Sequence, residues 1–315
     1  MRAAMEARVI DNFDELHALR EEWLELWRRS PNATPFQSPM WLLPWWRHFG
    51  SNELHAIALR DGGRLAALAP LYILRDDSES LGMFLGTGIS DYLDVLGEES
   101  FIEQIAAADC QLWDLQQLRA SSPLLAAALP SGFTDNVEDQ EPCLVLPLAE
   151  LSLSTHFQKK LRYYQRRLGE VTFEEANAEN LNQLLQSLFD LHAARWQRRG
   201  MPGMLGDDVI QQFHREVAKG MLEAGALRMY AIRTAGRIVA VFYGFADAAT
   251  VYYYLSGYDP QLEKLSPGTL IIAHAIERAV RGGTTTFDFL RGAEDYKLSW
   301  GAKERMNRRR QLIKV

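Results

Sequence analysis

The sequence has few cysteines, and its first 150 residues contain no lysine. Two cysteines, Cys110 and Cys143, are too few for a disulfide framework in 315 residues and have no metal-ligand spacing, so we interpret both as buried apolar side chains. No His, Cys or carboxylate cluster has ligand spacing, and we expect no metal. No apolar run approaches the roughly 20 residues that cross a bilayer, and the N-terminus lacks the apolar segment of a secretory signal. We therefore expect a cytoplasmic protein without membrane insertion.

Charge is distributed unequally along the chain. Residues 1–150 contain ten arginines and 24 acidic residues, a net charge of −14, whereas residues 151–315 contain 24 basic and 17 acidic residues, a net charge of +7. A basic half favours an anionic ligand, but this excess is too diffuse to demand nucleic acid. Two solvated surfaces of opposite sign that help the halves to associate explain the asymmetry equally well.

The second half contains a clear order of helices and strands. Ser266 is a suitable N-cap, Pro267 suits the first position of a helix, and Gly282-Gly283 ends that helix. Apolar periodicity and turn signals predict the other elements. The expected elements are a basic helix (156–170), a strand (171–176), helices (179–200 and 207–225), three strands (227–234, 237–246 and 250–258), a helix from Ser266, and strands (284–290 and 308–315).

The first half repeats this order more loosely. A strand and two helices precede a hairpin across Asp61-Gly62-Gly63, and a strand with a polar loop, a helix and an extended segment follow. There is little similarity between individual residues of the halves, so the repeat is inferred from element order alone. The sequence predicts an α/β protein with two similar domains, at residues 1–150 and 151–315.

The most informative stretch is FDFLRGAEDYKLSWG, residues 287–301. It begins as a strand and breaks at Gly292 into a loop rich in polar and aromatic side chains, which is where α/β proteins usually hold their chemistry. Asp288 alternates with two phenylalanines and needs a partner if buried, which Arg291 is close enough to supply. A structural ion pair and a carboxylate that orients or deprotonates an amine are equally good interpretations of Asp288.

Several stretches resemble one branch of the GNAT acyltransferases. They are TPFQSPMWLLPWWRHFG (34–50), SDYLDVL (90–96), LHAARWQRRG (191–200), VYYYLSGYDP (251–260), LSPGTLIIAHAIERA (265–279) and FDFLRGAEDYKLSWGA (287–302). The branch is the GNAT-like acetyltransferase family associated with cellulose and exopolysaccharide biosynthesis (CelD/BcsL-like), which is related to the Fem-type aminoacyltransferases. The resemblance implies tandem GNAT-like domains with mixed sheets, the first degenerate and the second catalytic.

The resemblance also implies a donor site at the start of the helix after Ser266. In the GNAT fold, backbone N–H groups at this place hold the pyrophosphate of coenzyme A, and we expect Ser266, Pro267, Gly268 and Thr269 to do so for acetyl-CoA or another acyl-CoA. The segment LEKLSPGTL departs from the usual Gln/Arg-x-x-Gly-x-Gly/Ala pattern. A donor other than acetyl-CoA therefore stays open, and Fem-type enzymes, which use aminoacyl-tRNA, provide one.

Acyl transfer requires a neutral nucleophile, a donor to the carbonyl oxygen and a proton for the leaving group. Asp288 or Glu294 is the candidate base, and Tyr296 or Tyr258 the candidate acid. The residues expected to bind substrate are His192, Arg195 and Trp196 (from the resemblance of LHAARW), Tyr254, Ser256 and Tyr258 (one face of a strand), and Arg291 and Lys297 (for phosphate or a sugar carboxylate). A structural role is the alternative for each.

We expect an acyltransferase that moves an acyl group, such as acetyl, from a CoA or carrier-protein thioester to an amine or hydroxyl. The resemblance suggests a sugar or polysaccharide precursor as acceptor, with a cleft between the strands at 250–258 and 284–290. One alternative is a Fem-like enzyme that binds aminoacyl-tRNA on the basic helix through its five cationic residues, with Tyr163 and Tyr164 for base stacking. A solvated helix face explains those charges as well. Another alternative is a non-catalytic accessory protein of polysaccharide biosynthesis.

Overall fold

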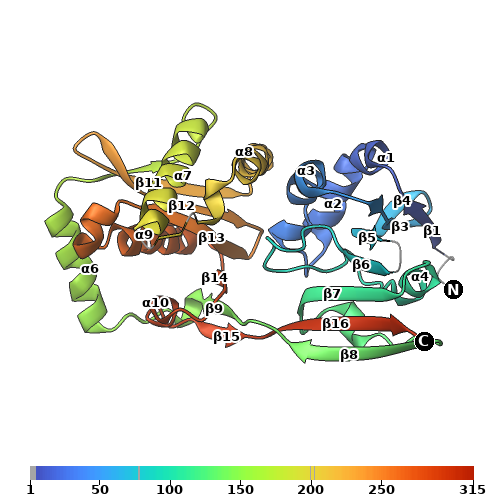
Figure 1. Cartoon of the computed structure of the whole chain (residues 1–315). Helices are drawn as coiled ribbons and strands as arrows, with labels where there is room; N and C mark the ends of the chain where they lie inside the picture. The colour runs from blue at the N-terminus through green and yellow to red at the C-terminus, as the bar shows by residue number, and fades with distance from the viewer. Residues whose placement is uncertain (1–4, 77–78, 199, 202) are drawn as a thin grey trace. The chain divides into compact units, whose positions relative to one another are not determined.

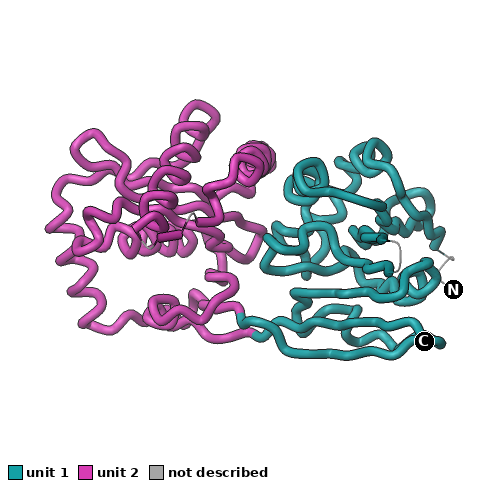
Figure 2. Tube along the Cα trace, viewed as in Figure 1, with its two compact units in different colours: residues 1–142, 306–315 teal, residues 143–305 magenta. Residues whose placement is uncertain are grey.

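The chain divides into two compact units. The computed structural model describes residues 5–76, 79–198, 200–201 and 203–315, so that Arg199, in the predicted second helix, lies outside the described residues. Unit 1 comprises Met1–Pro142 and Met306–Val315, and unit 2 comprises Cys143–Arg305 (Figures 1 and 2). In the described residues no helix is both long and apolar enough to traverse a bilayer.

Unit 2 is built on one seven-stranded mixed sheet. All neighbouring strands are antiparallel except β13 and β14, which are parallel and are connected through a helix. Its order is β10 (Thr172–Glu175), β11 (Leu227–Thr234), β12 (Arg237–Ala246), β13 (Thr250–Tyr258), β14 (Thr286–Arg291), β9 (Cys143–Pro147) and β15 (Lys303–Arg305).

Helices cover this sheet with their apolar stripes. In α7, leucines at the helical spacing, Leu181, Leu184, Leu185 and Leu188, are all buried, and the helix contacts β12 and β13. In α9 the buried residues include Leu270, and this helix contacts β11, β12 and β13. The helices of unit 2 are α6 (Thr155–Leu168), α7 (Leu181–Gln197), α8 (Asp208–Glu223), α9 (Pro267–Arg281) and α10 (Asp295–Leu298), with 3₁₀ turns η2 (Leu148–Glu150), η3 (Met204–Gly206) and η4 (Pro260–Leu265).

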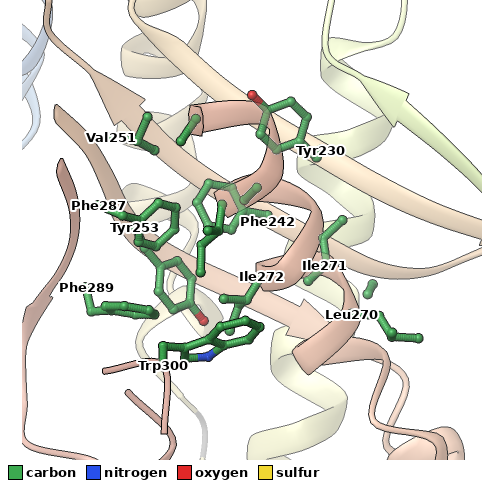
Figure 3. Packing of buried hydrophobic residues seen from close by; sticks show 14 of the residues in the cluster. Tyr230, Phe242, Val251, Tyr253, Leu270, Ile271, Ile272, Phe287, Phe289 and Trp300 are labelled. Atoms are coloured by element: carbon green, nitrogen blue, oxygen red, sulfur yellow. The ribbon is translucent and has the colours of Figure 1, made fainter. Parts of the chain in front are cut away.

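An aromatic core holds α9 to the sheet (Figure 3). Phe287 and Phe289 of β14 pack edge to face with their ring centroids 4.9 Å apart, and Tyr253 of β13 contacts Phe289. Trp300 closes the cluster and packs at 4.8 Å against Phe157 of α6. The phenylalanines of the stretch 287–301 are therefore core residues that fix where β14 ends.

Unit 1 repeats the same order of strands. Its three-stranded sheet has the order β1 (Glu6–Ile10), β3 (Ala56–Asp61) and β4 (Arg64–Ala69). Its six-stranded sheet has the order β2 (Glu53–Leu54), β5 (Leu71–Arg75), β6 (Ser80–Phe84), β7 (Leu112–Arg119), β16 (Asn307–Lys314) and β8 (Phe133–Asp139). The consecutive strands β2 and β3 pair antiparallel with β5 and β4, respectively, and β6 is parallel to β7 across α4. The helices are α1 (Phe13–Ala18), α2 (Arg20–Arg29), α3 (Pro39–Phe49), α4 (Ile102–Ala107) and α5 (Pro123–Ala126), with η1 (Pro35–Gln37).

Both units thus consist of an antiparallel meander followed by a parallel pair and two further strands. The tandem α/β architecture expected from element order is the observed one. In each unit the next-to-last strand of the sheet comes from the other side of the expected boundary at residue 150: β9 inserts between β14 and β15, and β16 inserts between β7 and β8. The structure therefore divides the chain at residue 142 rather than 150, and it returns residues 306–315 to unit 1.

The C-terminal strand also explains part of the charge asymmetry. In β16, Arg308, Arg309 and Arg310 pair with acidic residues of β7 and β8, and the Arg309 guanidinium lies 2.5 Å from the Asp114 carboxylate. These bonds raise the pKa of Arg309 above its ordinary value. Basic residues from the end of the chain therefore neutralise part of the acidic unit 1.

Candidate active site

The parallel strands β13 and β14 pair over a short distance and then part. Their register joins Thr250 to Thr286, Val251 to Phe287 and Tyr252 to Asp288, whereas β13 continues to Tyr258. The two strands are held together at their beginnings and are not paired at their carboxyl ends. This opening at the carboxyl end of a parallel pair is where α/β folds bind ligands.

A bulge in β13 decides which side chains face this opening. Opposite β12, the register passes from Leu255 to Tyr253, so Tyr254 is an extra residue. The bulge brings Tyr253 and Ser256 to the same side, with their hydroxyl oxygens 2.5 Å apart. Tyr254 instead packs against His214 of α8, with ring centroids 5.5 Å apart. The expectation that Tyr254, Ser256 and Tyr258 share one face is therefore wrong for Tyr254, because the extra residue reverses the alternation.

The loop after β14 brings Tyr296 to the same group. The Tyr296 hydroxyl interacts with that of Tyr253, while 40% of the Tyr296 surface remains exposed. Burial of the hydroxyl, followed by the neighbouring Tyr253 and Glu294, raises the pKa of Tyr296 well above its ordinary value. Burial also raises the pKa of Tyr253. Both phenols are therefore protonated at neutral pH and act as hydrogen-bond donors.

Gly292 lets the loop fold back on itself. Its φ is +100°, and a side chain at this position would meet the Glu294 carboxylate at 2.5 Å. Glu294 is largely exposed, forms a 2.8 Å ion pair with Lys297, and lies close enough to Tyr253 and Tyr296 to raise their pKa values. The glycine therefore allows a carboxylate beside the two phenols.

Lys297 has a different place from the expected one. It is 3% exposed, and its Nζ donates to the carbonyl oxygens of Arg291 (2.5 Å) and Gly292 (3.1 Å) in addition to the Glu294 contact. These three acceptors account for the three N–H groups of the ammonium. Lys297 therefore stabilises the loop, and the part of Arg291 that it contacts is the backbone carbonyl oxygen.

Arg195 and Tyr258 form the other side of the group. The Arg195 guanidinium lies over the Tyr258 ring, 5.0 Å from its centroid, and its charge lowers the pKa values of Tyr253 and Tyr296 against the larger effect of burial. The Tyr258 ring in turn lies against Gly268 at the start of α9: a Cβ atom at Gly268 would be only 2.9 Å from that ring. These contacts connect the ends of α7 and β13 to the first turn of α9.

His192 and Trp196 support Arg195 from within α7. The Trp196 Nε1 donates to the His192 Nε2 at 2.9 Å, and a side chain at Gly203 would strike both rings. His192 is 4% exposed, and burial, followed by the charge of Arg195, lowers its pKa to about 4. A neutral imidazole whose Nε2 already accepts a hydrogen bond is poorly suited to act as a base.

Asp288 is fully buried and its carboxylate has two partners. Its Oδ2 lies 2.6 Å from the Arg305 Nη2, and its Oδ1 accepts from the Leu290 backbone N–H at 2.8 Å. Leu290 has a φ of +60° at a bulge in β14, a conformation that costs about 1–3 kcal/mol unless it is held. Asp288 holds that bulge, and Arg305 is an ionic partner of its carboxylate. This geometry favours the structural interpretation.

Helix α9 begins at the expected residue, but Ser266 does not cap it as expected. Pro267 is the first helical residue, yet Ser266 has a φ of +47° and makes no side-chain capping bond, its hydroxyl donating to Glu263. The Thr269 N–H donates to the Ser266 carbonyl at 3.0 Å. This segment lies beside Tyr258 through Gly268, so the predicted donor loop and the predicted substrate residues belong to one region.

Sequence reasoning missed two residues of this region. They are Tyr253 and Arg305, neither of which was a candidate site residue in the sequence analysis. Spacing offers one signal for Tyr253: it and Ser256 are three residues apart and meet only if the strand contains a bulge. Among the described residues, no group of three or more His, Cys, Asp or Glu could hold a metal ion.

A known protein family matches most of unit 2. Residues 155–298 match the family described as Acetyltransferase (GNAT) domain. Unit 2 therefore contains a GNAT acetyltransferase domain, and the protein is an acyltransferase. A search of curated proteins finds no match.

Solved structures share the fold of the whole chain at low identity. FemX is 12% identical with a TM-score of 0.65, covering 97% of each chain. A conserved protein of unknown function from Bacteroides thetaiotaomicron is 13% identical with a TM-score of 0.64, covering 98% of this chain and all of that one. The C-terminal domain of a putative lysylphosphatidylglycerol synthetase from Agrobacterium fabrum is 13% identical with a TM-score of 0.56, covering 96% and 93%.

Proposed function

We propose that unit 2 transfers an acyl group, such as acetyl, from a coenzyme A or carrier-protein thioester to an amine or hydroxyl. The observation that carries this proposal is the meeting of Tyr253, Ser256, Tyr296, Glu294 and Arg195 where β13 and β14 part. The site combines protonated hydroxyl donors with one exposed carboxylate. Acyl transfer needs these two kinds of group and no metal.

In the proposed reaction, the acceptor nitrogen or oxygen attacks the thioester carbonyl carbon. The C–S bond breaks as the new C–N or C–O bond forms, and the acceptor's proton passes to Glu294 or to water. Tyr296 donates a hydrogen bond to the leaving sulfur. Because its pKa is raised above the ordinary value, complete proton transfer from Tyr296 is unfavourable, and stabilisation of the thiolate by the hydrogen bond is its main effect.

The donor's phosphates are proposed to bind at the first turn of α9, from Ser266 to Thr269. Gly268 supports this placement, because its lack of a side chain leaves the turn close to Tyr258 and hence to the reacting group. A sugar or envelope-polysaccharide precursor as acceptor rests on the resemblance described above to the CelD/BcsL-like family.

A second candidate is aminoacyl transfer from a charged tRNA. The FemX-like fold and the helix α6 favour it. In α6, five exposed cationic residues form no ion pair among the described residues, and Tyr163 is 48% exposed; the five are Lys159, Lys160, Arg162, Arg166 and Arg167. Binding of tRNA to this helix would weaken steeply with salt.

Calorimetry with acetyl-CoA, longer acyl-CoAs and charged tRNA separates the two. We expect an acyl-CoA to bind and charged tRNA to bind only weakly and without saturating. Saturable tRNA binding that is lost in a Lys159→Gln/Arg166→Gln variant would select the second candidate. Failure of every thioester to bind at millimolar concentration would overturn the first.

A further inference from the structure

Arg195 is a half-buried cation without a counter-ion. Among the described residues it has no hydrogen-bonded or ionic partner, and its Nε is buried with nothing to receive the hydrogen bond. By contrast, Arg233 pairs with Glu174, and Arg305 pairs with Asp288. Burying a guanidinium without a partner is costly, so an unpaired one at a ligand site indicates that the ligand supplies the anion.

The charged side chains near Arg195 indicate which group of a ligand it would bind. Its guanidinium lies over Tyr258 and acts electrostatically on Tyr253 and Tyr296. Glu294 acts on the same two phenols with the opposite sign. Both phenol hydroxyls are therefore near one positive and one negative side chain.

We propose that the acceptor is an amine that also carries a carboxylate, that is, an amino acid or a compound ending in one. This proposal rests on the proposed acyl transfer and names its substrate class. The carboxylate binds Arg195, whose planar fork suits two parallel hydrogen bonds, and the amine lies on the Glu294 side near Tyr296. The amine nitrogen bonds to the acyl carbon, the C–S bond breaks, one amine proton leaves to Glu294 or water, and the products are an N-acyl amino acid and the free thiol.

The geometry favours a carboxylate over a phosphate because Arg195 is the single free cation of this group in the described chain. Lys297 already binds the Glu294 carboxylate and two backbone carbonyl oxygens, so this group has no second cation available to balance a phosphate dianion. A phosphorylated amino sugar is therefore the competing outcome of the test.

The test compares acceptors that differ only in the carboxylate. Initial rates with acetyl-CoA are measured for L-lysine against cadaverine, for glycine against methylamine, and for glucosamine 6-phosphate. The enzymes are the full-length wild type, Arg195→Gln, and Lys219→Gln as a control that removes one exposed positive charge from α8.

We expect the wild type and Lys219→Gln to prefer a carboxylate acceptor by about 10²-fold in kcat/KM, as for loss of a charge-assisted hydrogen bond. Arg195→Gln should lose that preference through a raised KM for the carboxylate acceptor, with its acetyl-CoA affinity unchanged. Equal rates for matched pairs, a preference for glucosamine 6-phosphate, or weakened acetyl-CoA binding by Arg195→Gln would each overturn the proposal.

Acceptor binding separates this proposal from the proposed function. If no acyl-CoA binds, the acyl-transfer proposal fails, and calorimetry of L-lysine and cadaverine with the wild type and Arg195→Gln still decides the assignment of Arg195. Tighter binding of L-lysine that disappears in the variant supports the carboxylate site, and equal binding of the two amines refutes it.

Discussion

Asp288 and Arg305 form an ion pair at 2.6 Å in which the carboxylate is completely buried, and the same carboxylate accepts the N–H of Leu290. The pair joins the end of β14 to β15, so it fixes the place where β14 turns away from β13. The ion pair therefore stabilises the bulge in β14 from which the loop that carries Glu294 and Tyr296 begins.

Asp288→Asn is expected to destabilise unit 2 by about 3 kcal/mol, the low end for breaking a buried pair, because Arg305 is partly exposed. Activity per folded molecule should change little, since the asparagine still accepts from Leu290. Urea unfolding and kcat on the folded fraction test this. A loss of kcat above 10³-fold with unchanged stability would restore Asp288 as the base.

Tyr296→Phe should lower kcat by about 10²-fold while leaving stability and acetyl-CoA affinity nearly unchanged. The reason is that this hydroxyl is the donor available to the leaving sulfur, whereas the ring is 40% exposed and its core contribution is small. Steady-state rates and calorimetry check it. The matched variant Tyr163→Phe, on the exposed face of α6, should retain full activity.

Acidification should destabilise unit 2 between pH 6.5 and about 4. Burial lowers the pKa of His192 to about 4 and of His214 to about 3, so the unfolded chain takes up protons in this range before the folded chain does. The stability that the neutral imidazoles represent is present above pH 6.5 and is lost as pH falls. Each histidine contributes a slope of about 1.4 kcal/mol per pH unit.

A His214→Gln variant should show a shallower fall of urea midpoint between pH 6.5 and 4.5 than the wild type, because glutamine does not titrate. His17, on the surface of α1, has no comparable burial, so His17→Gln should retain the wild-type slope. Identical slopes for the wild type and His214→Gln would show that His214 is not kept neutral.

A fragment of residues 143–305 should be better folded than one of residues 151–315. The second lacks β9, which lies between β14 and β15, and it carries β16, whose neighbours β7 and β8 are in unit 1. Circular dichroism and cooperative urea unfolding of both fragments compare them. Equal or better folding of 151–315 would contradict the strand exchange.

Local signals in the sequence predicted much of unit 2. Leucine spacing predicted α7, Pro267 predicted the start of α9, and a strand was predicted at 284–290, which pairs in parallel with β13. The exchange of β9 and β16 was not predictable, because short strands are specified by partners far along the chain and not by their own residues.

The sequence predicted where the candidate site lies better than it predicted what each residue does there. Separate arguments named Arg195, Ser256, Tyr258 and Tyr296. In the structure Arg195 lies over Tyr258, and Tyr253 contacts both Ser256 and Tyr296. Alternation failed at Tyr254, since one inserted residue turns the following side chains to the other face. The burial of Lys297 was not visible either, because a flexible charged side chain gives no sign of turning toward carbonyl groups of its own loop.

The release of free thiol from acetyl-CoA in the presence of an amine acceptor, compared between the wild type and Tyr296→Phe, tests the central claim most directly. The account predicts acceptor-dependent release by the wild type and about a 10²-fold lower rate for the variant, with both binding acetyl-CoA equally. Equal rates for the two proteins, with acetyl-CoA bound by both, would contradict a reaction centre where β13 and β14 part.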